Sequence, residues 1–205
     1  MLVYRKLGDY VMKKVIISGI LLTAIFCGIN LSFADSQTDS QQQYIAKIQA
    51  NGIKYTTRGF MQVIMNNNAK FTEDFILAGM DAKTSTWGKV PPAYAAIYSG
   101  SDKALEVLLN NGVDANAEIA GETPLMLAIC RKQPKIVDVL ISHGANVNQV
   151  SGNKKPLNYA LKKKQIKIAN SLLKAGAKAD DDALVRAIKL KNSALKEAVL
   201  LHYSK

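Results

Sequence analysis

Few side chains in this sequence could carry out catalysis. The two histidines, His143 and His202, have no cysteine, serine or carboxylate beside them in a known catalytic spacing. Cys130 is followed by Arg131 and Lys132, and neighbouring cations favour a reactive thiol. No later cysteine can act as its resolving partner, so a passive small side chain is the preferred interpretation. The sequence therefore predicts a protein that is not an enzyme.

Asp180, Asp181 and Asp182 form a run of three carboxylates that could suggest a cation site. Three consecutive side chains cannot all point toward one ion, whereas acidic residues suit both the cap and the dipole of a helix N-terminus. We therefore expect a helix to begin at this run. The sequence also has no phosphate-cradling glycine loop and no cluster of metal ligands, so we predict no metal and no cofactor.

The segment GETPLMLAIC, residues 121–130, predicts the start of a helix. Thr123 can accept a hydrogen bond from a first-turn N–H, and Pro124 suits the first helical position. Leu125, Ala128 and Ile129 follow at the spacing of one helix face. A second apolar face and a stop follow, formed by Ile136, Val137, Leu140, Ile141 and then Gly144, with Asp138 on the outside.

This helix–turn–helix unit recurs at a fixed interval of 32 residues. A constant period with matching punctuation is the signature of a stacked repeat array. The residues that keep the interval are Pro92, Pro124 and Pro156, Ala96, Ala128 and Ala160, Leu108, Leu140 and Leu172, and Gly112, Gly144 and Gly176.

The best copy, GETPLMLAICRKQPKIVDVLISHGANVN, resembles ankyrin repeats. It has the threonine-proline-leucine start, the inner alanine, the isoleucine-valine second helix and the glycine-alanine-x-x-asparagine finger of that family. The position usually held by histidine is Tyr94, Met126 or Asn158 in the three clearest copies. The resemblance implies an all-α fold, an ankyrin-repeat solenoid of about 4–5 helix–turn–helix repeats with short hairpin fingers. We place repeats at residues 54–86, 87–119, 120–151 and 152–182, and a C-terminal cap at 183–205.

The N-terminal part of the chain predicts export. Residues 1–34, with translation starting at Met1 or Met12, show the basic, apolar and small-residue succession of a signal peptide that is cleaved after Ala34. Residues 15–33 could instead remain as a membrane anchor, although their polar content favours cleavage. Residues 35–53 are read as a polar linker with a short helix near 44–48. The expected location is periplasmic or secreted, with no stable membrane span after cleavage.

The charge of the chain is strongly positive. Loss of residues 1–34, which carry four basic and one acidic side chain, lowers the net charge from +11 to +8. Residues 152–178 contain eight lysines and no acid. Because arginines for base edges and interleaved aromatic residues are lacking, a nucleic-acid partner is not expected. The lysines are either a solvated face or a surface that attracts an acidic partner or the anionic envelope surface.

The resemblance implies a non-enzymatic interaction module, a monomer that binds another protein through the concave face of fingers and first helices. A periplasmic protective or redox accessory that uses Cys130, or a toxin-neutralising immunity protein, is the alternative. Aromatic and arginine side chains dominate interface hot spots, although Trp87 could instead fold over the start of its own repeat. The candidate partner-binding residues are Trp87, Val90, Tyr98, Ile119, Glu122, Arg131, Lys154, Lys162 and Lys163, with Ser99 and Ser151 also expected to be exposed.

Overall fold

A computed structural model describes residues 31–83, 90–118 and 121–203, with only the backbone described for 31–36. The chain divides into two units, residues 1–43 and residues 44–205. Helix α3 (Leu31–Ala50) supplies the described part of the first unit and continues into the second. No helix in the described part of the chain is long and apolar enough to cross a membrane.

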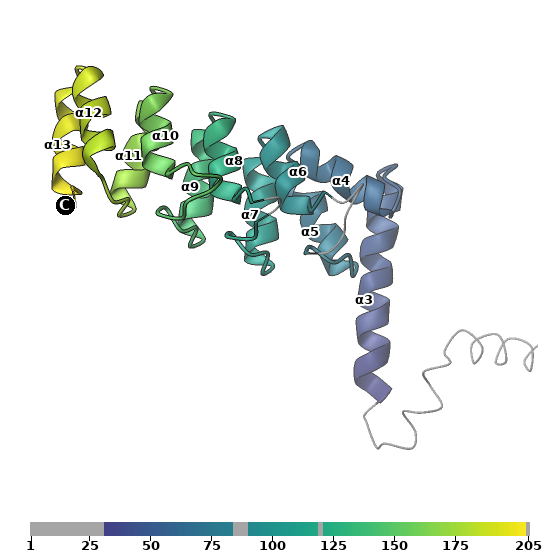
Figure 1. Ribbon diagram of the computed structural model, residues 1–205. Coiled ribbons are helices and arrows are strands. Elements are labelled where there is room, and N and C mark those ends of the chain that lie inside the picture. The colour runs from purple at the N-terminus through teal and green to yellow at the C-terminus, as the bar shows by residue number, and fades with distance from the viewer. Residues whose placement is uncertain (1–30, 84–89, 119–120, 204–205) are drawn as a thin grey trace, which may run out of the picture. The chain divides into compact units, whose positions relative to one another are not determined.

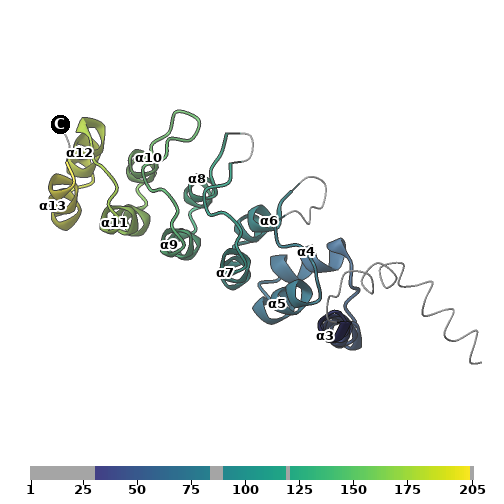
Figure 2. The ribbon, with the colours of Figure 1, turned by 90° about the horizontal axis from the view of Figure 1, so that it is seen from below.

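The second unit is an all-α array of paired helices (Figure 1). The first helices of the pairs lie in one layer and the second helices in another, with the finger loops on the side of the first helices (Figure 2). The first helices are α4 (Thr57–Met65), α6 (Pro92–Ser99), α8 (Pro124–Cys130), α10 (Pro156–Lys162) and α12 (Asp181–Lys189). The second helices are α5 (Ala69–Leu77), α7 (Asp102–Asn110), α9 (Pro134–Ser142), α11 (Ile166–Lys174) and α13 (Ser193–Leu201).

Local sequence explains where these helices begin and end. Thr123 is the N-cap of α8, and its hydroxyl accepts the Met126 N–H at 3.1 Å, as expected. Gly144 follows α9 with a φ of +82°, a left-handed conformation that glycine adopts at little cost. The five turns within the pairs also need a left-handed residue, but only Gly100 is a glycine there. The other turns use Asn67, Lys132, Lys164 and Lys191.

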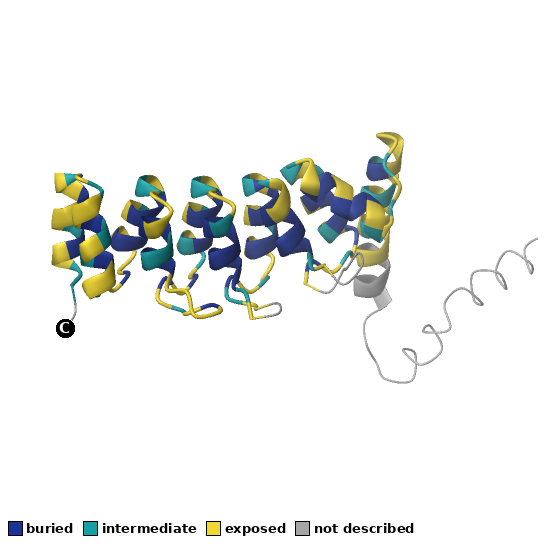
Figure 3. Ribbon diagram, turned by 45° about the horizontal axis from the view of Figure 1, so that its top comes forward, coloured by how far each residue is buried: buried dark blue, intermediate teal, exposed yellow. Residues whose placement is uncertain are grey.

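The core runs between the two helix layers (Figure 3). Leu140 is completely buried, as are its counterparts Leu108 and Leu172 in the neighbouring repeats. Asp138 lies exposed on the opposite side of α9. The predicted core face of the second helices is therefore confirmed.

The fingers are joined by asparagines at 32-residue intervals. The Asn116 amide donates to the Gly144 carbonyl at 3.1 Å, and its oxygen accepts the Asn146 N–H at 2.7 Å. Asn148 makes the same pair of bonds to Gly176 and Lys178. Each finger is thereby fixed to the backbone of the next repeat.

Two expected boundaries differ from the structure. Residues 35–50 are helical in α3, where the sequence suggested a polar linker with a short helix, and the expected cleavage point after Ala34 falls inside this helix. Ile48 is fully buried, so the last turns of α3 belong to the repeat core. A helix begins at the acidic run as expected, since Asp180 accepts the Ala183 N–H and α12 starts at Asp181, two residues before the cap boundary placed at residue 183. The predicted signal peptide lies almost wholly outside the described residues.

Candidate functional site

Two of the predicted partner-binding residues come together from neighbouring repeats. The Arg131 guanidinium lies 4.4 Å from the centre of the Tyr98 ring and donates a hydrogen bond to the Tyr98 carbonyl oxygen at 2.7 Å. Tyr98 is exposed in the last turn of α6, and Arg131 is the C-cap of α8. Tyr98 is 56% exposed, so the pair lies at the protein surface. A cation over an exposed ring contributes about 0.5–1 kcal/mol, which favours the stacked arrangement.

A second aromatic ring occupies the same layer two repeats after Tyr98. Tyr159 of α10 is flanked by Lys154 and Lys163, whose amines lie 5.4 and 5.6 Å from the ring centre. The hydrogen bond to the Cys130 sulfur raises the pKa of the Tyr159 hydroxyl, and partial burial and the negative charge of Glu122 add to this rise. The hydroxyl therefore stays protonated at neutral pH.

These contacts link three repeats in order. Tyr98 touches Arg131, which follows Cys130 directly, and Cys130 is the main group that raises the pKa of Tyr159. We call Tyr98, Arg131, Tyr159, Lys154 and Lys163 the aromatic–cation row.

The remaining candidate residues have different positions. Val90, Lys154, Lys162 and Lys163 are exposed, as expected, and Glu122 is half-buried. Trp87 and Ile119 lie outside the described residues.

Ser151 is not an exposed finger residue, and this expectation was wrong. Only 4% of it is exposed. Its hydroxyl donates to the Gly121 carbonyl at 3.0 Å and accepts the Thr123 N–H at 3.2 Å. Ser151 thus connects the finger of one repeat to the start of the preceding α8, and a partner cannot reach it.

The positions that usually hold histidine in such repeats retain part of their polar role. The Tyr94 hydroxyl donates to the carbonyl oxygens of Ala117 and Glu122 in the next finger. The Asn158 amide donates to the carboxylate of Asp180, at 2.9 Å to the nearer oxygen. Met126 has no such group, so the polar link is missing in the third repeat.

Asp180, at the start of α12, has an unusually low pKa for a carboxylate. Burial acts to raise its pKa, but hydrogen bonds from Lys155, the Ala183 N–H and Asn158, together with the charge of Lys155, lower the pKa to about 2. The Lys155 amine lies 2.7 Å from the carboxylate. The acidic run is therefore a helix cap that is tied to α10.

A pocket of about 280 Å³ lies between α10 and α12. Its lining includes four cationic side chains and one carboxylate. Arg186 forms an ion pair with Asp182 at 2.8 Å, and Lys155 pairs with Asp180. Lys154 and Lys162 make no ion pair with the described carboxylates, so the pocket carries positive charge. The lining residues are Asn153, Lys154, Lys155, Asn158, Tyr159, Lys162, Asp182 and Arg186.

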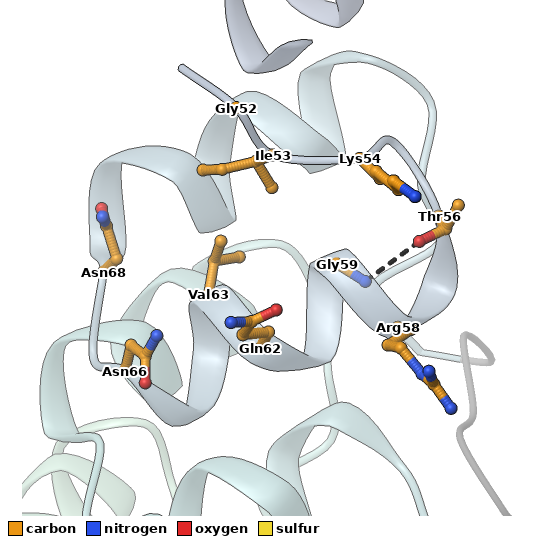
Figure 4. Close-up of a pocket in the computed structure, with 10 residues that line it drawn as sticks. All are labelled: Gly52, Ile53, Lys54, Thr56, Arg58, Gly59, Gln62, Val63, Asn66 and Asn68. Atoms are coloured by element: carbon orange, nitrogen blue, oxygen red, sulfur yellow. Dashed lines mark hydrogen bonds between the residues drawn. The ribbon is translucent and has the colours of Figure 1, made fainter.

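A larger pocket, of about 370 Å³, lies beside the first turn of α4 (Figure 4). Its amide side chains come from Gln62 of α4, from the α4 C-cap Asn66 and from the α5 N-cap Asn68, while the Arg58 guanidinium is directed away from them. Gly59 borders the pocket, and a Cβ added there would lie 2.1 Å from the Lys54 carbonyl oxygen. The glycine thus allows close packing of the chain, and the polar groups do not converge on one point as a catalytic site requires.

The histidines have structural roles in the described chain. His143 and His202 are the C-cap residues of α9 and α13, and the Nδ1 atom of each lies within 2.9 Å of the carbonyl oxygen four residues earlier. No group of three His, Cys, Asp or Glu side chains in residues 31–83, 90–118 and 121–203 could hold a metal ion. Cys130 is a half-buried free thiol at the end of α8.

Tyr159 is the site residue that the sequence reasoning missed. It occupies the register of Ala95 and Leu127, both of which are almost completely buried. The larger Tyr159 side chain is only half-buried, and its ring is flanked by Lys154 and Lys163. The change in side-chain size at this register was the available signal.

Comparison with protein families identifies the repeat array. The family model for ankyrin repeats (3 copies) matches residues 60–151 and 96–183, which together cover more than half of the chain. No curated protein matches the sequence.

Proposed function

Because the chain belongs to the ankyrin-repeat family, whose members are protein–protein interaction modules, we propose that it binds a partner protein through the aromatic–cation row. The finger loops and first helices on either side of the row complete the binding face. The protein acts as a scaffold for recognition and performs no chemistry on its partner.

The observation that supports this proposal is the stacking of Arg131 on the exposed ring of Tyr98. Arginine and tyrosine are the residue types that contribute most to interface hot spots. The carbonyl hydrogen bond of Arg131 holds the pair in place before a partner arrives. A preformed contact loses little side-chain entropy on binding, which favours affinity.

We also propose that the protein acts outside the cytoplasm, in the periplasm or the medium, after cleavage following Ala34. The support is the order of basic, apolar and small residues in 1–34. N-terminal sequencing of the protein from fractionated cells should begin at Asp35. Full-length protein in the inner-membrane fraction would instead identify residues 15–33 as an anchor.

Site-specific cross-linking tests the binding face. A variant with p-benzoylphenylalanine in place of Tyr98 should form a discrete cross-linked product with a partner in the cell envelope or medium on irradiation. The matched control carries the same group in place of Asp138, which is exposed on α9 in the other helix layer. Equal products from both positions, or none from Tyr98, would contradict the proposed face.

Once a partner has been identified, its affinity for the Arg131→Ala variant provides a second test. Loss of the Arg131 side chain should weaken binding by about 2 kcal/mol, as expected for a hot spot. Lys135→Ala, an exposed cation on α9, should leave the affinity unchanged.

A further inference from the structure

We infer that the pocket between α10 and α12 receives an acidic side chain from an extended segment of the partner protein. This inference rests on the proposed function and names the chemistry of the partner. It assigns the partner's carboxylate to Lys154 and Lys162, beside the ring of Tyr159.

The positive charge of the pocket favours an acidic occupant. Two of its four cations are already neutralised, Lys155 by Asp180 and Arg186 by Asp182, both within 2.8 Å. Lys154 and Lys162 are exposed and form no ion pair with the described carboxylates. Lysines that share one concave site repel each other, and an incoming carboxylate relieves this repulsion as well as pairing with both amines.

The position of Tyr159 adds an apolar surface to this charge. The Lys154 amine already lies over its ring at 5.4 Å, and Lys163 flanks the ring at 5.6 Å. A side chain that enters the pocket therefore meets both an aromatic face and two amines. Tyr159 also belongs to the aromatic–cation row. A partner segment that is anchored in the pocket can therefore extend along this row toward Tyr98.

The size of the pocket indicates which acidic partner fits. Its volume of about 280 Å³ is below the roughly 300–1,000 Å³ of small-molecule sites. A side chain of a larger partner suits this volume better than a whole small molecule does. A flat anionic membrane would contact the outermost lysines, on α11 as well as α10, rather than the groups inside the pocket.

Direct binding of a fluorescein-labelled peptide of ten glutamates tests the inference with residues 35–205, the product of the proposed cleavage. The wild-type protein should bind this peptide, and a peptide of ten glutamines should not bind. Lys154→Glu with Lys162→Glu should weaken binding of the acidic peptide at least about tenfold, because two attractive contacts become repulsive. The control Lys167→Glu with Lys174→Glu, at exposed positions on α11, makes the same change in net charge and should weaken binding less than about threefold.

Three results would overturn the inference. They are no binding of the acidic peptide by the wild type, an equal loss in both double variants, or binding to anionic phosphatidylglycerol vesicles that depends equally on the α10 and α11 lysines. Circular dichroism and thermal unfolding of each variant exclude loss of folding as the cause. If Tyr98 still cross-links a partner whose binding is indifferent to the Lys154 and Lys162 changes, the inference fails while the proposed function stands.

Discussion

The two ends of the repeat array are closed by different forces. At the N-terminal end, Ile48 at the end of α3 is fully buried in the core, and Lys47 pairs with the buried Asp74 at 2.7 Å. At the C-terminal end, Asp180 caps α12 and pairs with Lys155, while Leu201 of α13 is 84% exposed. Buried apolar side chains and one buried ion pair close the N-terminal end, whereas at the C-terminal end a more exposed polar network adds to the buried Leu195 and Val199.

This difference has physical consequences for each end. Apolar burial changes little with pH or salt, whereas ion pairs weaken when a carboxylate is protonated or when salt screens it. In a solenoid each repeat contacts only its neighbours, so the two ends can unfold separately. The ends should therefore respond to different conditions.

The largest effect is expected in the middle of the array, which provides the reference for both ends. Leu140 is completely buried between repeats on either side, so Leu140→Ala should lower the free energy of unfolding by about 2–5 kcal/mol. Urea unfolding followed by circular dichroism measures this loss. Leu200→Ala, at a position 47% exposed, is the control and should cost much less. An unchanged midpoint for Leu140→Ala would mean that the central repeats do not carry the stability of the array.

Ile48→Ala tests the apolar closure of the N-terminal end. The expected cost is about 2 kcal/mol, at the low end of such changes, because an end can relax around a cavity more easily than the middle. Hydrogen exchange should become faster in α4 and α5 and remain unchanged in α10 and α11. The control at the other end is Ile188→Ala, since Ile188 is 51% exposed and its loss should leave exchange unchanged. Faster exchange throughout the array would show that the end does not unfold separately.

The sequence predicted the regular part of this structure well, and the reasons are local. The Thr123 cap, the buried Leu140 and the left-handed Gly144 each follow from side-chain chemistry within one repeat. Repetition then fixed the stacking, because every unit must bury the same face. The pairing of predicted residues Tyr98 and Arg131 was compatible with this register but was not foreseen.

The expectations that failed depend on contacts between distant segments. Ser151 looked like a finger residue, and only its bonds to Gly121 and Thr123, about 30 residues away, explain its burial. The polar composition of residues 35–53 suggested a linker with a short helix near 44–48, but composition alone does not show that residues 31–50 form one helix whose last turns bury Ile48. By contrast, the helix start expected at the acidic run is confirmed, since Asp180 stands where the repeat pattern has the finger asparagine and caps α12.

Asp180→Asn tests the polar closure of the C-terminal end. The pKa of Asp180 is about 2 in the folded protein, against an ordinary value of 3.8 that applies to the unfolded chain. The carboxylate therefore stabilises the folded state fully above about pH 4, and this stabilisation is lost as the pH falls toward 2. Since the side chain is 34% exposed, solvent screening reduces this contribution to about 1 kcal/mol. Asparagine keeps an acceptor for the Ala183 N–H but cannot pair with Lys155.

The expected observation is a difference that depends on pH. Urea unfolding should show the variant less stable than the wild type by about 1 kcal/mol at pH 7, and the two should converge as the pH approaches 2. Asp138→Asn, at an exposed position on α9, should shift stability by less than about 0.5 kcal/mol at either pH. A constant difference between Asp180→Asn and the wild type from pH 7 to pH 2 would mean that the ion pair does not close this end.

The smallest expected effect uses one substitution that should have opposite signs at the two ends. Asn67 and Lys191 occupy the left-handed turn position of the first and last helix pairs, with φ of 54° and 53°. Glycine relieves the strain of this conformation at both positions. The side-chain oxygen of Asn67 also accepts the N–H groups of Lys103 and Ala104 at 2.9 and 3.1 Å, and thus caps α7 of the next repeat. No next repeat follows Lys191 in the described chain, and its exposed side chain has no such role.

Lys191→Gly should therefore raise stability by up to about 1 kcal/mol, whereas Asn67→Gly should lower it by about 1 kcal/mol through loss of the cap. Thermal unfolding of the two variants under one condition measures both signs, and a gain in Asn67→Gly would show that strain outweighs the inter-repeat cap.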